Sequence, residues 1–246
     1  MADFDIDAVR KEIAPSSTLI CAINHGNVVL VRRGATDDSP TGVSVDLATA
    51  LAESLSLPVR FRHYDKAGAV SGSAKTGEWD VCFLAVDPKR SEVISFSDPY
   101  VQIEGAFLVR HDAGASGVTD VERLRLKIGA VRGSAYELFL SRNGGSGELI
   151  LFDSFPEVLA ALDGGLLDGL AGVRQAMNIA ARERSGFAVL DESFMAIPQA
   201  VGVSADRPLA ARYTAAFVQQ KKSSGFVRES LMRSGHGDVV IPPGST

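Results

Sequence analysis

The chain has few cysteines, few basic residues and no long apolar run. Only two of its 246 residues are cysteine, which excludes a disulfide framework. Neither cysteine has metal-ligand spacing to any of the four histidines, so no metal is predicted. No apolar stretch is long enough to cross a membrane, so insertion into one is not predicted. With 30 acidic against 25 basic residues and no basic stripe, the composition argues against a nucleic-acid partner.

Sequence signatures of common enzymes are also missing. No G-x-G-x-x-G follows a strand, and G-x-S-x-G and H-E-x-x-H do not occur. The first residues, Met1 to Asp7, are acidic and lack the basic start and apolar core of a signal peptide. The predicted location is the cytoplasm if Met1 is the native start, and the periplasm if a leader was removed.

What is present is an alternation of strand-like and helix-like segments, which predicts an α/β protein. Strands are predicted at residues 19–23, 59–63, 80–86, 107–110, 127–131, 168–172 and 200–203. Helices are predicted at residues 45–55, 67–76, 154–162 and 226–232, and from residues 134 and 206 onward. Ser134-Ala-Tyr-Glu137 and Ser154-Phe-Pro-Glu157 have the form of capping boxes that open two of these helices.

One four-residue pattern occurs twice. Gly77-Glu-Trp-Asp80 and Gly165-Leu-Leu-Asp168 each lead from a helix into an apolar strand, as if two similar lobes used the same turn. In parallel α/β sheets, ligands bind beyond the carboxyl ends of the strands. The segments expected to line a site are therefore residues 24–27, 85–90, 133–135 and 172–175.

The two cysteines lie inside apolar, strand-like runs. Cys21 belongs to Thr18-Leu-Ile-Cys-Ala-Ile23, and Cys82 to Asp80-Val-Cys-Phe-Leu84. Both are predicted to be buried free thiols that act as small apolar side chains.

The most specific pattern is Asp80-Val-Cys-Phe-Leu-Ala-Val-Asp-Pro-Lys-Arg90, followed by Phe96-Ser-Asp-Pro-Tyr100. Together with Thr41-Gly-Val-Ser-Val-Asp-Leu-Ala48 and Val131-Arg-Gly-Ser134, it resembles the type II periplasmic solute-binding proteins of the amino-acid-binding group, family 3 of the ABC-transporter binding proteins. The resemblance extends over roughly residues 18–230, with the motifs in the family's order.

The resemblance implies two α/β lobes joined by two crossing hinge strands, with a ligand between the lobes and no cofactor. The crossing strands correspond to residues 107–110 and 200–203. Lobe 1 is then predicted to comprise residues 1–109 and 201–246, and lobe 2 residues 110–200.

The resemblance also implies that Arg90 binds a ligand carboxylate, which a guanidinium matches with its fork of donors. The side chain is expected to face an open cleft, so that its loss would leave stability nearly unchanged. The alternative is a surface arginine on a helix that Asp87 caps. Gly133 and Ser134 are expected to offer backbone N–H groups to an anion at a helix start, although Ser134 can equally act as the cap alone.

Several positions depart from the family pattern. Val173, followed by Arg174, stands where the family has the aspartate that pairs with a ligand ammonium. Other departures or candidate wall residues are Ala85, Asp87, Asn24 and Glu104. Glu104 could supply the missing negative charge, or could be a solvated surface carboxylate. The ligand is therefore predicted to be a carboxylate that lacks an α-ammonium group.

The predicted function is a non-catalytic solute-binding protein that closes on a small carboxylate-bearing metabolite, with an ABC-transporter permease as a possible partner. The first alternative is a cytoplasmic enzyme on the same fold, of dehydratase or lyase type, with Glu104 or His25 as acid or base. The second is a ligand sensor.

Overall fold

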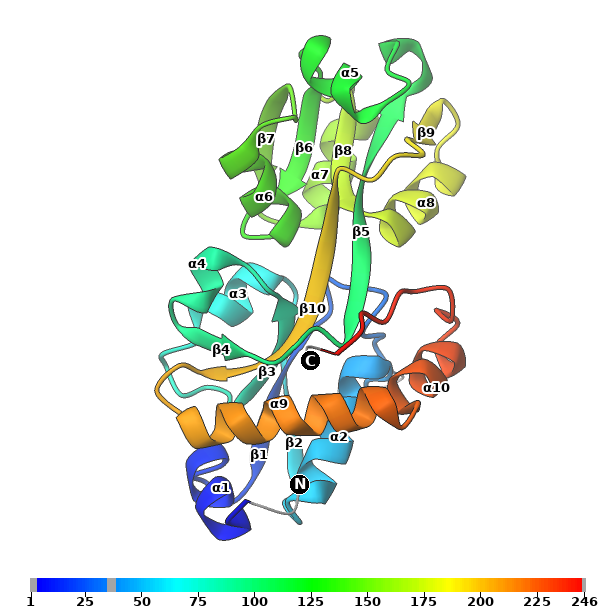
Figure 1. Ribbon diagram of the computed structural model, residues 1–246. Helices are drawn as coiled ribbons and strands as arrows, with labels where there is room; N and C mark the ends of the chain where they lie inside the picture. Colours follow the sequence, from blue (N-terminus) through cyan, green and yellow to red (C-terminus); the bar gives the residue numbers. More distant parts are fainter. Residues whose placement is uncertain (1–3, 35–38, 245–246) are drawn as a thin grey trace. The chain divides into compact units, whose positions relative to one another are not determined.

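The computed structural model describes residues 4–34 and 39–244 and divides into two compact units. Unit 1 extends to Gln102 and resumes at Pro198, and unit 2 is Ile103–Ile197. The chain passes between them along two ten-residue strands, β5 (Val101–Arg110) and β10 (Met195–Ser204), which contain the segments predicted to cross (Figure 1). The observed boundaries between the units follow Gln102 and Ile197. Each lies earlier in the chain than the corresponding predicted boundary, which followed residue 109 or residue 200.

Unit 1 contains a mixed sheet. Its strand order is β2-β1-β3-β10, with β4 paired to β10. The first three strands are parallel, and β10 is antiparallel to both β3 and β4. The bounds are Leu19–Asn24 for β1, Val59–Tyr64 for β2, Val81–Ala85 for β3 and Ile94–Phe96 for β4.

Six helices accompany this sheet in the described part of unit 1. They are α1 (Ile6–Ile13), α2 (Val43–Ser54), α3 (Ala67–Gly72), α4 (Pro88–Ser91), α9 (Pro208–Ser223) and α10 (Phe226–Arg233). The sequence analysis did not predict α1, which Asp5 caps and which packs beside α9. Its Glu12 accepts hydrogen bonds from the backbone N–H groups of Leu209 and Ala210, at 2.7 and 2.9 Å. A carboxylate there satisfies free donors at the start of α9 and complements the helix dipole.

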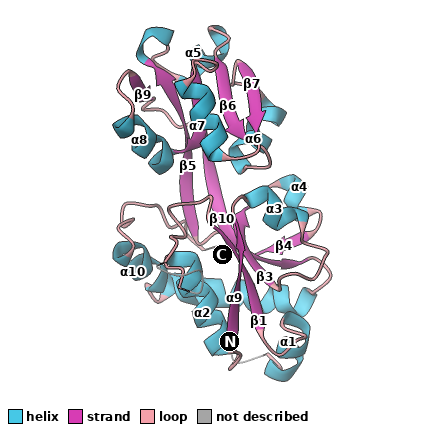
Figure 2. Ribbon diagram, turned by 180° about the vertical axis from the view of Figure 1, so that it is seen from behind, coloured by secondary structure: helices cyan, strands magenta, loops and turns pink. Residues whose placement is uncertain are grey.

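Unit 2 contains a sheet of order β5-β8-β6-β7, with β9 paired to β5. Its remaining strands are β6 (Lys127–Val131), β7 (Glu148–Phe152), β8 (Gly169–Val173) and β9 (Phe187–Val189). Its helices are α5 (Val118–Arg123), α6 (Ala135–Asn143), α7 (Phe155–Asp163) and α8 (Arg174–Glu183), seen from behind in Figure 2. β7, β9, α5 and α8 were not predicted.

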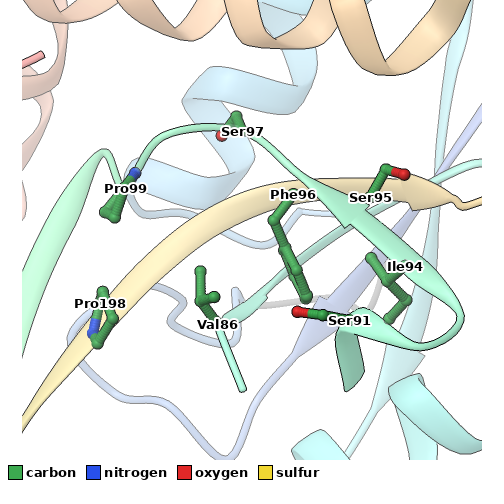
Figure 3. Close-up of a pocket in the computed structure, with 8 residues that line it drawn as sticks. All are labelled: Val86, Ser91, Ile94, Ser95, Phe96, Ser97, Pro99 and Pro198. Carbon is green, nitrogen blue, oxygen red and sulfur yellow. The ribbon is translucent and has the colours of Figure 1, made fainter. Parts of the chain in front are cut away.

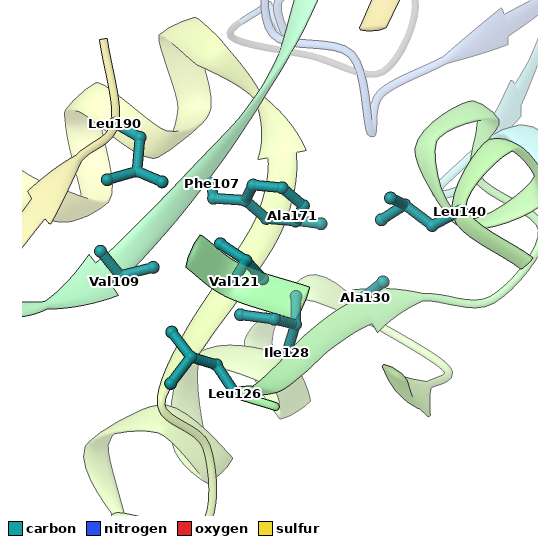
Figure 4. Close-up of a cluster of buried hydrophobic side chains, with 9 residues drawn as sticks. All are labelled: Phe107, Val109, Val121, Leu126, Ile128, Ala130, Leu140, Ala171 and Leu190. Carbon is teal, nitrogen blue, oxygen red and sulfur yellow. The ribbon is translucent and has the colours of Figure 1, made fainter. Parts of the chain in front are cut away.

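One core of unit 2 is formed by side chains from strands and helices on one side of this sheet (Figure 4). Phe107 of β5 is fully buried and stacks on Phe194, with ring centroids 4.4 Å apart. The other buried members are Val109, Val121, Leu126, Ile128, Ala130, Leu140, Ala171 and Leu190. This burial, together with that of a second cluster that contains Leu108, Leu170 and Met177, stabilises the sheet that carries residues 133–135 and 172–175.

The repeated Gly-x-x-Asp turn has the same structure in both units. Asp80 accepts a hydrogen bond from the Ile20 N–H at 2.9 Å, and Asp168 accepts one from the Lys127 N–H at 2.9 Å. The second carboxylate oxygen of each aspartate bonds an arginine: Arg207 at 2.9 Å for Asp80, and Arg110 at 3.3 Å for Asp168. Each aspartate therefore fixes the start of the neighbouring parallel strand and ties it to a distant arginine.

The glycines of these turns have a specific conformational role. Gly77 and Gly165 have φ angles of 73° and 72°, which a side chain disfavours. The four-residue pattern is thus one backbone turn used twice, as the sequence suggested.

Both cysteines are buried free thiols, as predicted. Cys82 pairs with Ala22 across β1 and β3, while Cys21 pairs with Val81. Because paired residues share a face and side chains alternate along a strand, the two thiols point to opposite faces of the sheet. Burial raises the pKa of the Cys82 thiol to about 12 and raises that of Cys21 as well.

We expect a thiol titration of the unfolded, unreduced protein to count two thiols. The folded protein should react slowly with the same reagent, because both groups are buried and protonated. A count of zero would show a disulfide and contradict the face assignment.

Within residues 4–34 and 39–244, no helix combines the length and the apolar character that crossing a membrane requires.

Candidate functional site

Arg90 lies on α4, the single helical turn that follows β3 in unit 1. Asp87 caps this turn by accepting a hydrogen bond from the Lys89 N–H at 2.9 Å, which confirms its predicted capping role. Pro88 occupies the first helical position, where its fixed φ suits a helix start. The cap and the proline place Arg90 immediately behind the carboxyl end of β3.

The Arg90 side chain is buried, with only 2% of the residue exposed. Its Nη1 donates to the Ala85 carbonyl oxygen at 3.0 Å, at the last residue of β3. The expectation of a guanidinium facing an open cleft is therefore wrong. Burial of a charged side chain at a strand end requires charge-compensating or hydrogen-bonding partners, and it makes Arg90 a structural element as well as a candidate ligand contact.

Asn24 ends β1 and His25 follows it, at the same edge of the unit 1 sheet. Asn24 is buried, and its side-chain oxygen accepts from the Gly26 N–H at 3.1 Å. The His25 Nε2 and His63 Nδ1 atoms lie 2.8 Å apart, so the two rings share a hydrogen bond. His25, one of two residues considered as acid or base in the enzyme alternative, thus already has a side-chain partner.

A cavity of about 520 Å³ lies in unit 1 among residues that follow β3 and residues of β4 (Figure 3). Val86 borders it next to Ala85, and its lining contains no charged side chain. The lining residues are Val86, Ser91, Ile94, Ser95, Phe96, Ser97, Pro99 and Pro198. Such a lining does not suit a carboxylate, since no cationic donor faces the cavity.

In unit 2, Gly133 and Ser134 precede α6, and Ser134 caps this helix as predicted, but the reciprocal bond of the predicted capping box is made by the Gly133 N–H and not by that of Ser134. The Ser134 Oγ accepts from the Glu137 N–H at 3.1 Å, and the Glu137 carboxylate accepts from the Gly133 N–H at 2.9 Å. The Ser134 N–H donates to the Val131 carbonyl at 3.1 Å. The two amides expected to hold an anion are therefore engaged within the protein, which corrects that part of the prediction.

The start of α6 also contains backbone N–H groups that the helix itself does not satisfy. Ala135 is the first residue of the helix, and the first N–H groups of an α-helix have no carbonyl partner within the helix. The Ser134 cap occupies the Glu137 N–H, whereas the amides of Ala135 and Tyr136 have no partner within the helix. The sequence analysis included Ala135 in its third segment and did not single it out.

Val173 ends β8, and Arg174 begins α8. Val173 pairs with Gly105 across β5 and β8, which places Glu104 next to Arg174. The Arg174 guanidinium contacts the Glu104 carboxylate and donates to the carbonyls of Leu190 and Asp191 at 3.1 and 2.9 Å. Glu104 is consequently the counter-ion of Arg174, so its proposed role as a replacement for the missing aspartate is not supported.

No cluster of three or more His, Cys, Asp or Glu residues in the described segments could hold a metal ion. The candidate residues of each unit lie at the carboxyl ends of parallel strands. They are Ala85, Asp87 and Arg90 in unit 1, and Gly133, Ser134 and Val173 in unit 2. The carboxyl ends of the strands are where ligands bind in α/β proteins.

Solved structures define the class of protein to which this architecture belongs. An amino-acid ABC-transporter substrate-binding protein from Streptococcus pneumoniae, bound to L-arginine, superimposes with a TM-score of 0.76 at 20% identity, over 96% of this chain and 99% of that one. A histidine-kinase sensor domain similar to periplasmic binding proteins gives a TM-score of 0.77 at 20% identity, over 92% and 98% of the two chains. The chain therefore has the fold of type II periplasmic binding proteins, as predicted.

Sequence comparison then gives the family. The model of bacterial extracellular solute-binding proteins, family 3, matches residues 21–234, so the chain belongs to that family and is a solute-binding protein. A probable histidine-binding protein from Neisseria gonorrhoeae is 25% identical over 133 residues, which is 52% of this chain and 49% of that protein. The match thus spans about half the length of that curated relative.

Proposed function

We propose that the chain binds a small solute through a carboxylate group and that Arg90 is the principal contact. The observation that carries this proposal is the buried guanidinium behind the carboxyl end of β3, held by the Ala85 carbonyl. A charge-assisted hydrogen bond to a carboxylate contributes about 1.5–3 kcal/mol, which corresponds to a roughly 10- to 150-fold gain in affinity.

We propose further that the solute lacks an α-ammonium group. Each acidic candidate is already engaged: Asp87 caps α4, and Glu104 contacts Arg174. Glu137 accepts from the Gly133 N–H and from the Ser141 hydroxyl, the latter at 2.9 Å. Val173 offers an ammonium group no polar side chain. An ammonium removed from water without a carboxylate partner would cost several kcal/mol.

A thermal-shift screen of the twenty standard amino acids against simple organic acids tests this ligand class. We expect organic acids to raise the melting temperature and the amino acids to leave it nearly unchanged. Native mass spectrometry of the purified protein should identify a co-purified carboxylate. Micromolar binding of several standard amino acids would contradict the proposal. Glu104 would then be the first residue to test as the partner of the ligand ammonium group.

The partner that best fits such a chain is an ABC-transporter permease in the membrane that faces the periplasm. The support for this proposal is the family itself and the fold shared with an ABC-transporter substrate-binding protein. Fractionation of the native cells tests it: recovery of the chain in the periplasmic fraction supports delivery to a permease, and recovery in the cytoplasm contradicts it.

A further inference from the structure

The cavity of unit 1 has no part in the contact proposed between Arg90 and a carboxylate. Its volume of about 520 Å³ falls within the range of roughly 300–1,000 Å³ that small-molecule sites occupy. Ser91, one of its lining residues, is exposed, so the cavity is open to solvent beside α4. The chemistry of its lining indicates which part of a solute it would accept.

Two of the three serines in the lining already use their hydroxyl groups. The Ser91 Oγ donates to the Asp87 carbonyl at 3.0 Å. The Ser97 Oγ donates to the Asp98 carbonyl at 2.8 Å and accepts from the Val201 N–H at 3.1 Å. A hydroxyl has one hydrogen to donate, so these two serines have none left for a solute.

The third serine, Ser95, lies on the other face of β4. Side chains alternate along a strand, so Ile94 and Phe96 point to the same side, toward Ser91, while Ser95 points away from it (Figure 3). Ile94 is buried and Phe96 is half-buried. Together with Val86 and two prolines, they give the cavity apolar walls. The part of a solute that fits there is therefore apolar as well.

One peptide unit connects this cavity to Arg90. The Arg90 Nη1 donates to the Ala85 carbonyl at 3.0 Å. The N–H of the same peptide unit belongs to Val86 and donates to the Pro198 carbonyl at 2.9 Å. Val86 and Pro198 line the cavity, and so does Ser91, the residue after Arg90. The guanidinium and the cavity are thus close enough to hold two ends of one small molecule.

We propose that the cavity binds the apolar tail of the solute whose carboxylate Arg90 binds. The solute class is then a carboxylate with an uncharged hydrocarbon tail. Burial of the tail adds affinity because apolar surface leaves water. Every residue on which this inference depends belongs to unit 1. The inference rests on the proposed function and makes its ligand class more specific.

Isothermal titration of unbranched acids tests the role of the cavity. The probes are propionate, butyrate, pentanoate and hexanoate, each of which is one methylene group longer than the one before. We expect the affinity to rise by up to about fourfold per added methylene group, which corresponds to about 0.8 kcal/mol. Hexanoate should therefore bind the wild-type chain about tenfold or more tightly than propionate does.

Three variants sharpen the test. Ser91→Phe narrows the cavity from its exposed wall and should remove most of the difference between hexanoate and propionate. Ser223→Phe makes the same change at an exposed position of α9, outside the cavity lining, and should keep that difference. Phe96→Trp places a fluorescent side chain in the wall. Hexanoate should shift its emission to shorter wavelength because the tail displaces water, whereas propionate should not, and the wild-type chain with Trp79 alone gives the background.

The outcomes separate this inference from the proposed function. If the wild-type chain binds none of the four acids, the carboxylate function fails and the role of the cavity fails with it. If the wild-type chain binds all four acids equally, or a folded Ser91→Phe variant keeps the preference for hexanoate, the role of the cavity is wrong while the proposed function stands. An unchanged emission of Phe96→Trp at saturating hexanoate contradicts the inference in the same way, even if Ser91→Phe does not fold.

Discussion

Replacing Arg90 by alanine is expected to weaken binding of the carboxylate ligand by at least tenfold, because the loss of about 1.4 kcal/mol already does so. The buried position of the side chain adds a second effect. The Ala85 carbonyl, buried at the end of β3, loses its donor, and an unsatisfied buried acceptor costs about 1–3 kcal/mol of stability. Calorimetry with the ligand and thermal denaturation without it measure the two effects separately.

Lys89→Ala is the matched control, since Lys89 is exposed on the same helical turn and has the same charge. It should change neither affinity nor stability by a measurable amount. Arg90→Lys keeps the positive charge and loses the two-pronged geometry, so its affinity should lie between those of the wild type and Arg90→Ala. A folded Arg90→Ala variant with wild-type affinity would remove Arg90 from the binding site.

Asp80→Ala is expected to destabilise unit 1 by about 3–5 kcal/mol, the usual cost of removing one partner of a buried ion pair. The carboxylate side chain of Asp80 is 8% exposed and its partner Arg207 is 20% exposed, so little solvent compensates the lost pair. The substitution also removes the acceptor of the Ile20 N–H at the start of β1. Trp79, the single tryptophan of the chain, is buried next to Asp80, so its fluorescence during chemical denaturation reports on this unit.

Asp168→Ala makes the equivalent change in unit 2 and serves as the comparison. Its side chain is 28% exposed and that of Arg110 is 37% exposed, so water replaces part of the lost interaction and the cost should be smaller, about 1 kcal/mol. Asp80→Asn keeps an oxygen for the Ile20 N–H and should fall between alanine and the wild type. Equal destabilisation by Asp80→Ala and Asp168→Ala would show that burial does not control the strength of this turn.

The helices and strands that the sequence predicted have strong local signals. β6 coincides with the predicted residues 127–131, and the capping serines Ser134 and Ser154 mark the starts of α6 and α7. Elements without such signals were missed. α8 begins at Arg174 and its N-cap residue, Val173, makes no side-chain hydrogen bond. β9 is only three residues long, so both elements depend on contacts with the rest of unit 2.

The sequence predicted which segments of the chain would line the candidate site, but it did not predict the contacts of most of their side chains. Asp87 was identified as a cap because its position before a proline has a local physical meaning. The pairing of Glu104 with Arg174 joins residues 70 positions apart, and it follows from the register of β5 against β8. No local pattern encodes that register, so the sequence left the role of Glu104 open.

By itself, the sequence determined the α/β class, the family, the repeated Gly-x-x-Asp turn and the short helix that carries Arg90. These features depend on interactions between residues close together in the chain, or on motifs in a fixed order. The tertiary structure decided which polar groups remain available: it buried Arg90 against Ala85, engaged the amides of Gly133 and Ser134, and paired Glu104 with Arg174. The reason is that burial and hydrogen bonding depend on which distant segments pack together, and the residue types alone do not specify that packing.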